Sequence, residues 1–216
     1  KYPQARFFRY EPFGRDNVRA GLKSFFGRDH VALLPQLHRA TRVLSLDCDF
    51  LGMDRVGGNA VQGFSSARRA DRYDAADAAR PWKVRGPDEM MRLYVLESGF
   101  TVTGGMADHR GRLPASQIKN AALWIASKLG IETGAAPNEA TLNVEWLEAM
   151  VEDLKAAGSS AAVLAGSAHD AELHALTAAI NSSLGALGNT IKILDARVYP
   201  DETEYGSVAD FSGSLE

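Results

Sequence analysis

The sequence of 216 residues contains a single cysteine, Cys48. One cysteine cannot form a disulfide within the chain. It also cannot hold a structural zinc ion or an iron–sulfur cluster alone, because these take about four ligands. Charge of one sign is not in excess either, since 24 basic residues face 27 acidic ones and the net charge is −3. That balance argues against non-specific nucleic-acid binding, which usually needs a basic surplus.

Long apolar runs and the common site motifs are also missing. No apolar run approaches the roughly 20 residues that span a bilayer. The sequence has neither G-x-x-x-x-G-K-[ST] nor G-x-G-x-x-G, the usual phosphate loops, and neither H-E-x-x-H nor C-x-x-C. The G-x-S-x-G elbow of serine hydrolases is absent too. Ser167 as a nucleophile would need a base, and the sequence does not place one. His169 and His174 are five residues apart, so on a helix they point about 140° apart and are poorly placed to share a metal.

The composition is that of an ordinary globular domain with a core of its own. Hydrophobic residues make up 45% of the chain and charged residues 24%. We expect a single domain over residues 1–199, followed by a loosely held acidic tail over 200–216. Within the domain, residues 52–90 form a long excursion with one short helix expected near 65–73. Its mixed charges indicate a solvated or docking surface, on which Trp82 either anchors a partner or packs against its own domain.

Short apolar runs alternate with amphipathic segments along the rest of the chain. This pattern predicts an α/β fold with a doubly wound, mostly parallel sheet and helices on both faces. A glycine-rich loop is expected between the strand at 93–96 and Gly111. The expected strands are 5–10, 43–46, 93–96, 161–165 and 191–194, and the expected helices are 16–26, 114–129, 144–157 and 169–184.

Ligands of such sheets bind at the carboxyl ends of the strands, which directs attention to residues 47–53, 97–111 and 166–170. Asp47 and Asp49 follow one strand and Glu97 ends another. Carboxylates there accept a ribose hydroxyl or a cation and repel a pyrophosphate; the alternative is that they cap turns. Cys48 lies between two carboxylates, which raise the pKa of a thiol, so we expect it to be a spectator.

Three stretches resemble the molybdopterin oxidoreductases. Residues 40–52 resemble the strand and turn of that family, and residues 92–109 resemble its D-P-R-x-T-x-T-A segment. The later strand and helix of the family resemble residues 162–166, with further likeness at 178–181 and 188–189. The matching positions of the second stretch are Thr101, Thr103, Ala107-Asp108 and Leu113-Pro114.

A variant branch is more similar still, through Ser45–Gly52, Met106–Arg110 and Tyr10-Glu-Pro12. This branch is the iron–sulfur subunit of alternative complex III, a quinol:cytochrome c oxidoreductase of respiratory electron transport, also labelled an iron–sulfur-cluster-containing hydrogenase component. The resemblance implies a molybdopterin oxidoreductase or formate dehydrogenase-like domain that holds no molybdenum. It also implies iron–sulfur clusters in a downstream ferredoxin-like domain, other subunits as partners, and a place at the periplasmic face of the inner membrane.

Two departures from the parent family favour an altered site. Asp47 and Asp49 stand where the family keeps small neutral groups near a pyrophosphate, and Ser98-Gly99 replaces its Pro-Arg. We therefore expect a non-catalytic scaffold domain, inactive alone, with no cofactor of its own, no metal ligands, no membrane span and no nucleic acid. The alternatives are a free-standing regulatory domain, or an α/β oxidoreductase domain that still binds a pterin or nucleotide. The residues of that vestigial pocket would be Asp47, Asp49, Glu97, Thr101, Thr103, Gly166 and Ser167.

Overall fold

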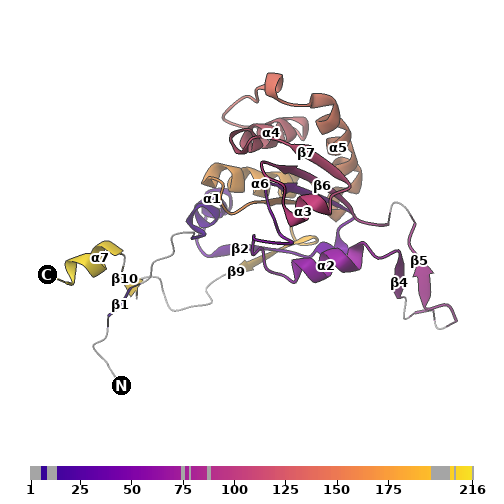
Figure 1. Ribbon diagram of the computed structural model, residues 1–216, viewed down its shortest axis with the longest axis horizontal. Helices are drawn as coiled ribbons and strands as arrows, with labels where there is room; N and C mark the ends of the chain where they lie inside the picture. Colours follow the sequence, from indigo (N-terminus) through magenta and orange to yellow (C-terminus); the bar gives the residue numbers. More distant parts are fainter. Residues whose placement is uncertain are drawn as a thin grey trace.

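A four-stranded parallel sheet forms the centre of the computed structural model (Figure 1). The structure describes residues 6–8, 14–73, 76–77, 79–86, 89–195, 205–206 and 208–215. The strand order is β7-β6-β3-β8, and every neighbouring pair in it is parallel. The strands are β3 (Arg42–Leu46), β6 (Arg92–Glu97), β7 (His109–Arg112) and β8 (Ala161–Ala165).

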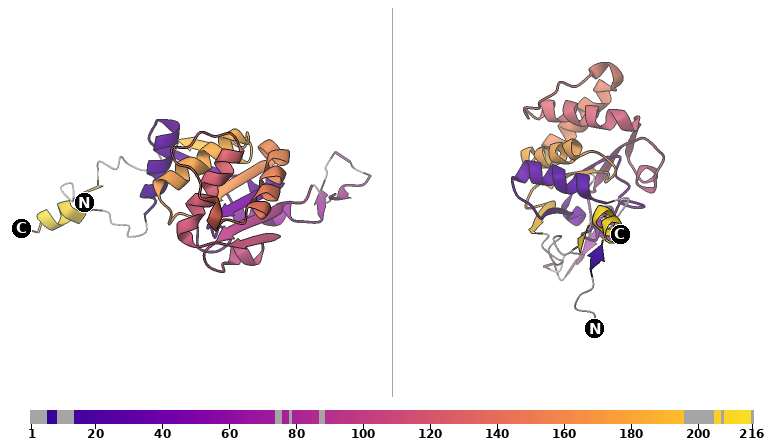
Figure 2. Two further views of the ribbon diagram at one scale, coloured as in Figure 1. Left: turned by 90° about the horizontal axis from the view of Figure 1, so that it is seen from above. Right: turned by 90° about the vertical axis from the view of Figure 1, so that its left-hand side faces the viewer.

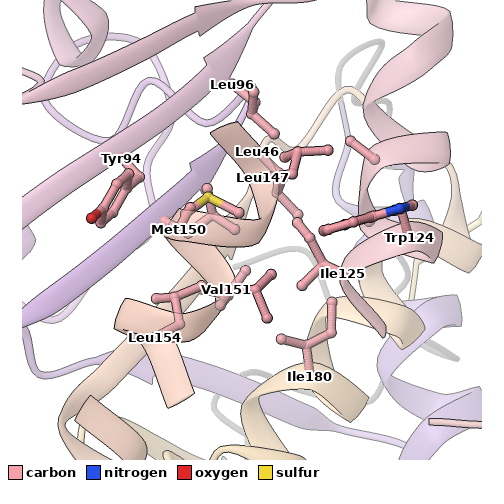
Figure 3. Packing of buried hydrophobic residues seen from close by; sticks show 14 of the residues in the cluster. Leu46, Tyr94, Leu96, Trp124, Ile125, Leu147, Met150, Val151, Leu154 and Ile180 are labelled. Atoms are coloured by element: carbon pink, nitrogen blue, oxygen red, sulfur yellow. The ribbon is translucent and has the colours of Figure 1, made fainter. Parts of the chain in front are cut away.

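Apolar side chains are buried on both faces of this sheet, which explains why its inner strands are continuous apolar runs. One face packs against three helices, and Figure 3 shows Leu46 and Leu96 in one cluster with Trp124, Met150 and Ile180. These helices are α4 (Ala115–Lys128), α5 (Val144–Ala157) and α6 (Ala171–Ser183). The other face packs against the short helix η1 (Leu37–Arg39) and α2 (Ala60–Ala67). The predicted α/β class, with a parallel sheet between helices, is thereby confirmed.

The last expected strand is real but does not join the parallel sheet. Instead, β9 (Ile191–Asp195) pairs antiparallel with β2 (Val31–Pro35), a strand that the sequence analysis did not predict. The first helix, α1 (Asp16–Phe26), packs on α6 and ends at Gly27, whose φ of 67° is left-handed. Its boundaries match the prediction.

The excursion after β3 differs from the prediction in detail. Its helix, α2, covers 60–67 rather than 65–73, because Gly63 packs closely against η1; a Cβ there would lie 3.0 Å from the His38 nitrogen. The strands β4 (Asp71–Tyr73) and β5 (Trp82–Val84) then form a hairpin that projects from the body (Figures 1 and 2). Trp82 is more than half exposed, and the guanidinium of Arg69 lies over its ring.

The expected glycine-rich loop contains two elements of its own. A one-turn helix, α3 (Val102–Gly105), follows β6, and the edge strand β7 follows α3. The short helices η2 (Glu139–Thr141) and η3 (Gly158–Ser160) stand before and after α5. Since β7 reads His-Arg-Gly-Arg, it carries charge where an inner strand would carry apolar side chains, and the sequence pattern misses it.

A short segment near the start of the chain pairs with one near its end (Figure 1). Here β1 (Phe7–Phe8) pairs in parallel with β10 (Tyr205–Gly206), and α7 (Val208–Gly213) follows. The sequence pattern indicated no such elements beyond residue 200. Of the first expected strand, 5–10, residues 7–8 are a strand and residues 5, 9 and 10 lie outside the described residues, as do the Tyr10-Glu-Pro12 motif and residues 200–204. No helix in the described part of the chain is both long and apolar enough to cross a bilayer.

Side chains complete the hydrogen bonding of the edge strand β8. Asn181 on α6 is 1% exposed, and its Oδ1 accepts from Val163 N at 2.9 Å. Its Nδ2 donates to Val163 O at 2.8 Å and to Thr177 O at 3.0 Å. Thr190 Oγ1 donates to Ala161 O on the same strand. One amide therefore satisfies both backbone groups of Val163 on this edge.

The contact of α1 with α6 contains a buried histidine that should make stability depend on pH. His174 is 6% exposed, and its Nε2 has no hydrogen-bond partner among the described residues. Burial, then the positive charges of His169 and Arg15, lower the pKa of His174, against an opposing effect of Asp170. The unfolded chain therefore binds more protons than the native one below the ordinary pKa of 6.5.

We expect the free energy of unfolding to be flat above that pKa and to fall as the pH drops through it. Urea denaturation between neutral and mildly acidic pH measures this slope, and His174→Leu should lose most of it. His38→Gln, at an exposed position on η1, is the matched control and should keep the slope. An unchanged slope in His174→Leu would show that other groups cause it.

Candidate functional site

Three turns converge at the carboxyl edge of the sheet. Residues 47–54 follow β3, residues 98–105 follow β6, and residues 166–170 follow β8. The strands bring these turns together directly, because Asp47 N donates to Leu96 O at 2.7 Å and Gly166 N donates to Leu46 O at 3.0 Å. The segments that the sequence analysis nominated, 47–53, 97–111 and 166–170, overlap these three turns.

Asp47 links the turns after β3, β6 and β8. Its Oδ1 accepts from Ser98 N at 2.9 Å, Ser98 Oγ lies 3.1 Å from Oδ2, and His169 Nε2 lies 3.2 Å from Oδ2. Its backbone is left-handed with φ 51°, a conformation that aspartate tolerates better than most residues. Burial works against ionisation, but the hydrogen bonds from His169 and Ser98 outweigh it and lower the pKa of Asp47.

Asp49 joins the turn after β3 to α3. Its Oδ1 accepts from Thr103 N at 3.0 Å and from Thr103 Oγ1 at 2.8 Å, while its Oδ2 accepts from Met53 N at 3.0 Å. Thr103 Oγ1 also accepts from Leu51 N. Burial alone would raise the pKa of Asp49, but these bonds from Thr103 and Met53 lower it overall. The carboxylate therefore already has three donors.

Asp54 is a site residue that the sequence analysis missed. Its Oδ2 accepts from Asp49 N at 2.8 Å. Its Oδ1 accepts from Ser167 N at 3.1 Å and from Ser167 Oγ at 2.6 Å. The Ser167 hydroxyl thus donates to a carboxylate that also accepts from two backbone amides, Asp49 N and Ser167 N. Asp54 and Ser167 are 113 residues apart, and no local pattern signals their contact.

Glu97 is 1% exposed and lies beneath α3. It accepts from Thr101 Oγ1 at 2.6 Å and forms an ion pair with Arg110 of β7. Thr101 Oγ1 also accepts from Gly104 N at 3.0 Å, which caps α3. Gly104 leaves the room for Glu97, since a Cβ there would lie 1.8 Å from Oε1. Arg110 and the capping role of Thr101 tie Glu97 into the fold.

All seven predicted pocket residues lie at this edge, where they take part in four contacts. Asp47 contacts the chain near Gly166, Asp49 binds Thr103, and Glu97 binds Thr101; Ser167 binds Asp54. Ser98, His169 and Arg110 complete the network. His169 lies in the nominated segment 166–170, so its position at this edge could be predicted. Its partner, Asp47, could not.

Hydrogen bonds from the protein itself already engage the carboxylates of Asp47, Asp49 and Asp54 at this edge. Within them, no three side chains of the histidine, cysteine, aspartate or glutamate type gather as metal ligands. Cys48 is buried, and burial together with the Asp54 and Asp49 carboxylates raises the pKa of its thiol, as predicted in direction. A shallow hollow lies elsewhere, at the ends of α4, α5 and α6, and is lined by Lys128, Leu129, Lys155, Gly158, Ser183 and Leu184.

Comparison of the chain with protein-family models and with curated proteins finds no match in either.

Proposed function

We propose that this chain is a non-catalytic scaffold domain of the molybdopterin oxidoreductase type, with the doubly wound fold of that family. In this proposal it belongs to the iron–sulfur subunit of a membrane-bound quinol oxidoreductase and positions electron-carrying modules without reacting itself. Two arguments support it: the sequence resemblance described above, and the occupied state of the carboxyl edge. The second argument rests on contacts of the protein itself and is the stronger of the two.

The observation that supports the proposal most directly is that backbone amides at this edge donate hydrogen bonds to the protein's own carboxylates. In α/β folds, such amides bind the phosphates of a nucleotide or dinucleotide cofactor. Here Ser98 N donates to Asp47, Thr103 N donates to Asp49, and Ser167 N donates to Asp54. An entering phosphate would have to displace all three bonds and then stand beside three negative charges. Repulsion between a phosphate and a neighbouring carboxylate costs several kcal/mol where water is excluded.

The remaining parts of the proposal follow from the resemblance alone. The iron–sulfur clusters would lie in a downstream ferredoxin-like domain, and this chain would hold no cofactor. Its partners would be that domain and the other subunits of the complex, at the periplasmic face of the inner membrane. A run of C-x-x-C-x-x-C-x-x-x-C encoded beyond Glu216 would support this assignment, and a gene whose continuation lacks such cysteines would oppose it.

The experiment that tests an occupied edge combines elemental analysis with ligand titration. The purified chain is assayed for iron, molybdenum, tungsten and oxidised-pterin fluorescence. It is then titrated with pyrophosphate and with ADP while the amide signals of Ser98, Thr103 and Ser167 are followed by NMR. We expect no stoichiometric metal or pterin, no movement of these signals and no rise in the melting temperature.

Stoichiometric pterin, or saturable shifts of those three amides, would contradict the scaffold and favour the rival reading of a ligand-binding oxidoreductase domain. The Gly134 amide, in an exposed loop, serves as the internal control for effects of ionic strength. A shift that Gly134 shares with the three site amides is a salt effect and counts as no binding.

A further inference from the structure

The two edge strands of the parallel sheet differ in how their outer backbone groups are bonded. On β8, the Asn181 amide bonds both backbone groups of Val163. At the other end of the strand order lies β7, which pairs only with β6. Every second residue of a paired strand turns its N–H and C=O away from the partner strand. In the described part of the chain, no other strand and no side chain bonds to these outward groups of β7, so its outer edge is open.

Aromatic rings flank one face of this edge. Side chains alternate between the two faces of a strand, so His109 and Gly111 lie on the same face. His109 stacks on Tyr94, with 5.0 Å between the ring centres. A Cβ at Gly111 would lie 3.8 Å from the half-buried ring of Trp146 on α5. A strand added beside β7 would therefore meet aromatic rings on this face.

The opposite face carries two arginines in different settings. Arg110 forms an ion pair with Glu97. Glu97 also lies opposite Arg112 in the register of β6 and β7, but it is 1% exposed and already holds Arg110. Asp108, the acid just before the strand, is paired with Arg68. Arg112 is exposed and has no ion pair within the described residues, so its positive charge remains for an acidic side chain of a partner.

A second copy of the chain fits this edge poorly. Two β7 strands related by a two-fold axis would pair antiparallel. Centring that pair on Arg110 places Arg110 opposite its own copy, and centring it on Gly111 places Arg110 opposite Arg112. Like charges directly opposite each other destabilise a pair of strands, and charged side chains commonly protect an edge from self-pairing in this way. The same arginines admit a strand of the opposite charge.

We propose that the outer edge of β7 binds an extended segment of a partner protein, which joins the sheet as a fifth strand. The backbone of this segment uses the open N–H and C=O groups of β7. Its side chains alternate between acidic ones, which face Arg112, and apolar ones, which lie on the side of Trp146. In recognition of this kind, main-chain bonds supply affinity and the alternate side chains supply specificity. The inference goes beyond the proposed function and holds whether or not the chain belongs to an oxidoreductase.

Peptide binding tests the inference. The probes are labelled peptides of valine or isoleucine alternating with aspartate or glutamate, which present one apolar and one acidic face when extended. Fluorescence anisotropy with the whole chain should show saturable binding. Arg112→Glu should weaken this binding by about tenfold or more, because it sets like charges together. Arg28→Glu makes the same charge change at an exposed position after α1 and should bind like the native chain. Peptides with lysine in place of the acids should not bind.

Hydrogen exchange followed by NMR locates the bound peptide. The outward amides of β7 should exchange more slowly when the peptide binds, whereas Val163 N on β8 is already bonded to Asn181 and should not change. Absence of saturable binding overturns the inference, as does equal binding of the lysine peptides. Unchanged affinity in Arg112→Glu, shown to be folded by circular dichroism, also overturns it. Sedimentation velocity tests the other occupant: a dimer of the chain in which the same β7 amides are slowed would make a second copy the partner and contradict the inference.

Discussion

Replacing Asn181 with leucine should lower the free energy of unfolding by about 3–5 kcal/mol, among the largest effects of any single side chain here. The Asn181 amide both accepts from Val163 N and donates to Val163 O on the edge strand β8. Leucine has a similar volume but no polar atom, so it leaves a buried N–H and a buried C=O without partners. Each such group costs about 1–3 kcal/mol.

Urea denaturation followed by circular dichroism gives this free energy. Ser182→Ala, at the exposed neighbouring position of the same helix, is the control and should change it by less than about 0.5 kcal/mol. Asn181→Asp keeps the acceptor for Val163 N but places an oxygen against Val163 O, so it should not rescue stability. A loss below about 1 kcal/mol in Asn181→Leu would mean that water or a shifted strand satisfies β8.

Gly166→Ala should destabilise the fold by about 3 kcal/mol, at the upper end of the range for inserting one methyl group into a packed site. A Cβ at Gly166 would lie 2.0 Å from the Asp47 carbonyl oxygen and 2.9 Å from its carbonyl carbon. Both atoms are backbone and cannot turn aside like the end of a flexible side chain. The turns after β3 and β8 must therefore separate, which breaks the Gly166 N to Leu46 O bond and strains the contact of Asp54 with Ser167.

The same denaturation assay measures the loss, and NMR locates it. We expect the amides of Ser98 and Ser167 to shift and their exchange with solvent to accelerate. Gly134→Ala is the matched control, because a Cβ there meets nothing within 4 Å. Its effect should be close to zero or slightly stabilising. Equal stability of the two alanine variants would show that the turns are loosely packed.

The predictable part of the fold is the part that is buried on both faces. The strands β3, β6 and β8 were recognised because helices cover both sides of them, so their sequences are unbroken apolar runs. The edge strand β7 was not predicted because its side chains are mostly charged. It is a strand because its backbone pairs with β6, which its own sequence pattern does not indicate. The sequence analysis listed 191–194 among the strands of a mostly parallel sheet, but β9 pairs antiparallel with β2, which was not recognised as a strand.

In the candidate site, too, one part could be predicted from the sequence and another could not. Strand ends can be located from local patterns, so the positions of Asp47, Asp49 and Glu97 at the carboxyl edge followed from the sequence. Their partners could not, because they come from distant parts of the chain: Asp47 and His169 are 122 residues apart. A carboxylate that binds a ligand and one that binds its own backbone look alike in a sequence. Only the contacts of Ser98 N and Ser167 N separate the two cases.

The position of β3 in the middle of the sheet also bears on how the protein folds. Arg42 pairs with Arg92 on one side and with Ala161 on the other, so the two ladders of this strand close loops of 50 and 119 residues. Closing such loops costs chain entropy before native contacts repay it, and folds rich in distant pairings fold slowly. During synthesis the apolar segment 43–46 must wait for residues 161–165 to leave the ribosome. Over that interval β3 has β6 on one side but lacks β8 on the other, so one of its edges stays open to chaperones that shield apolar strands.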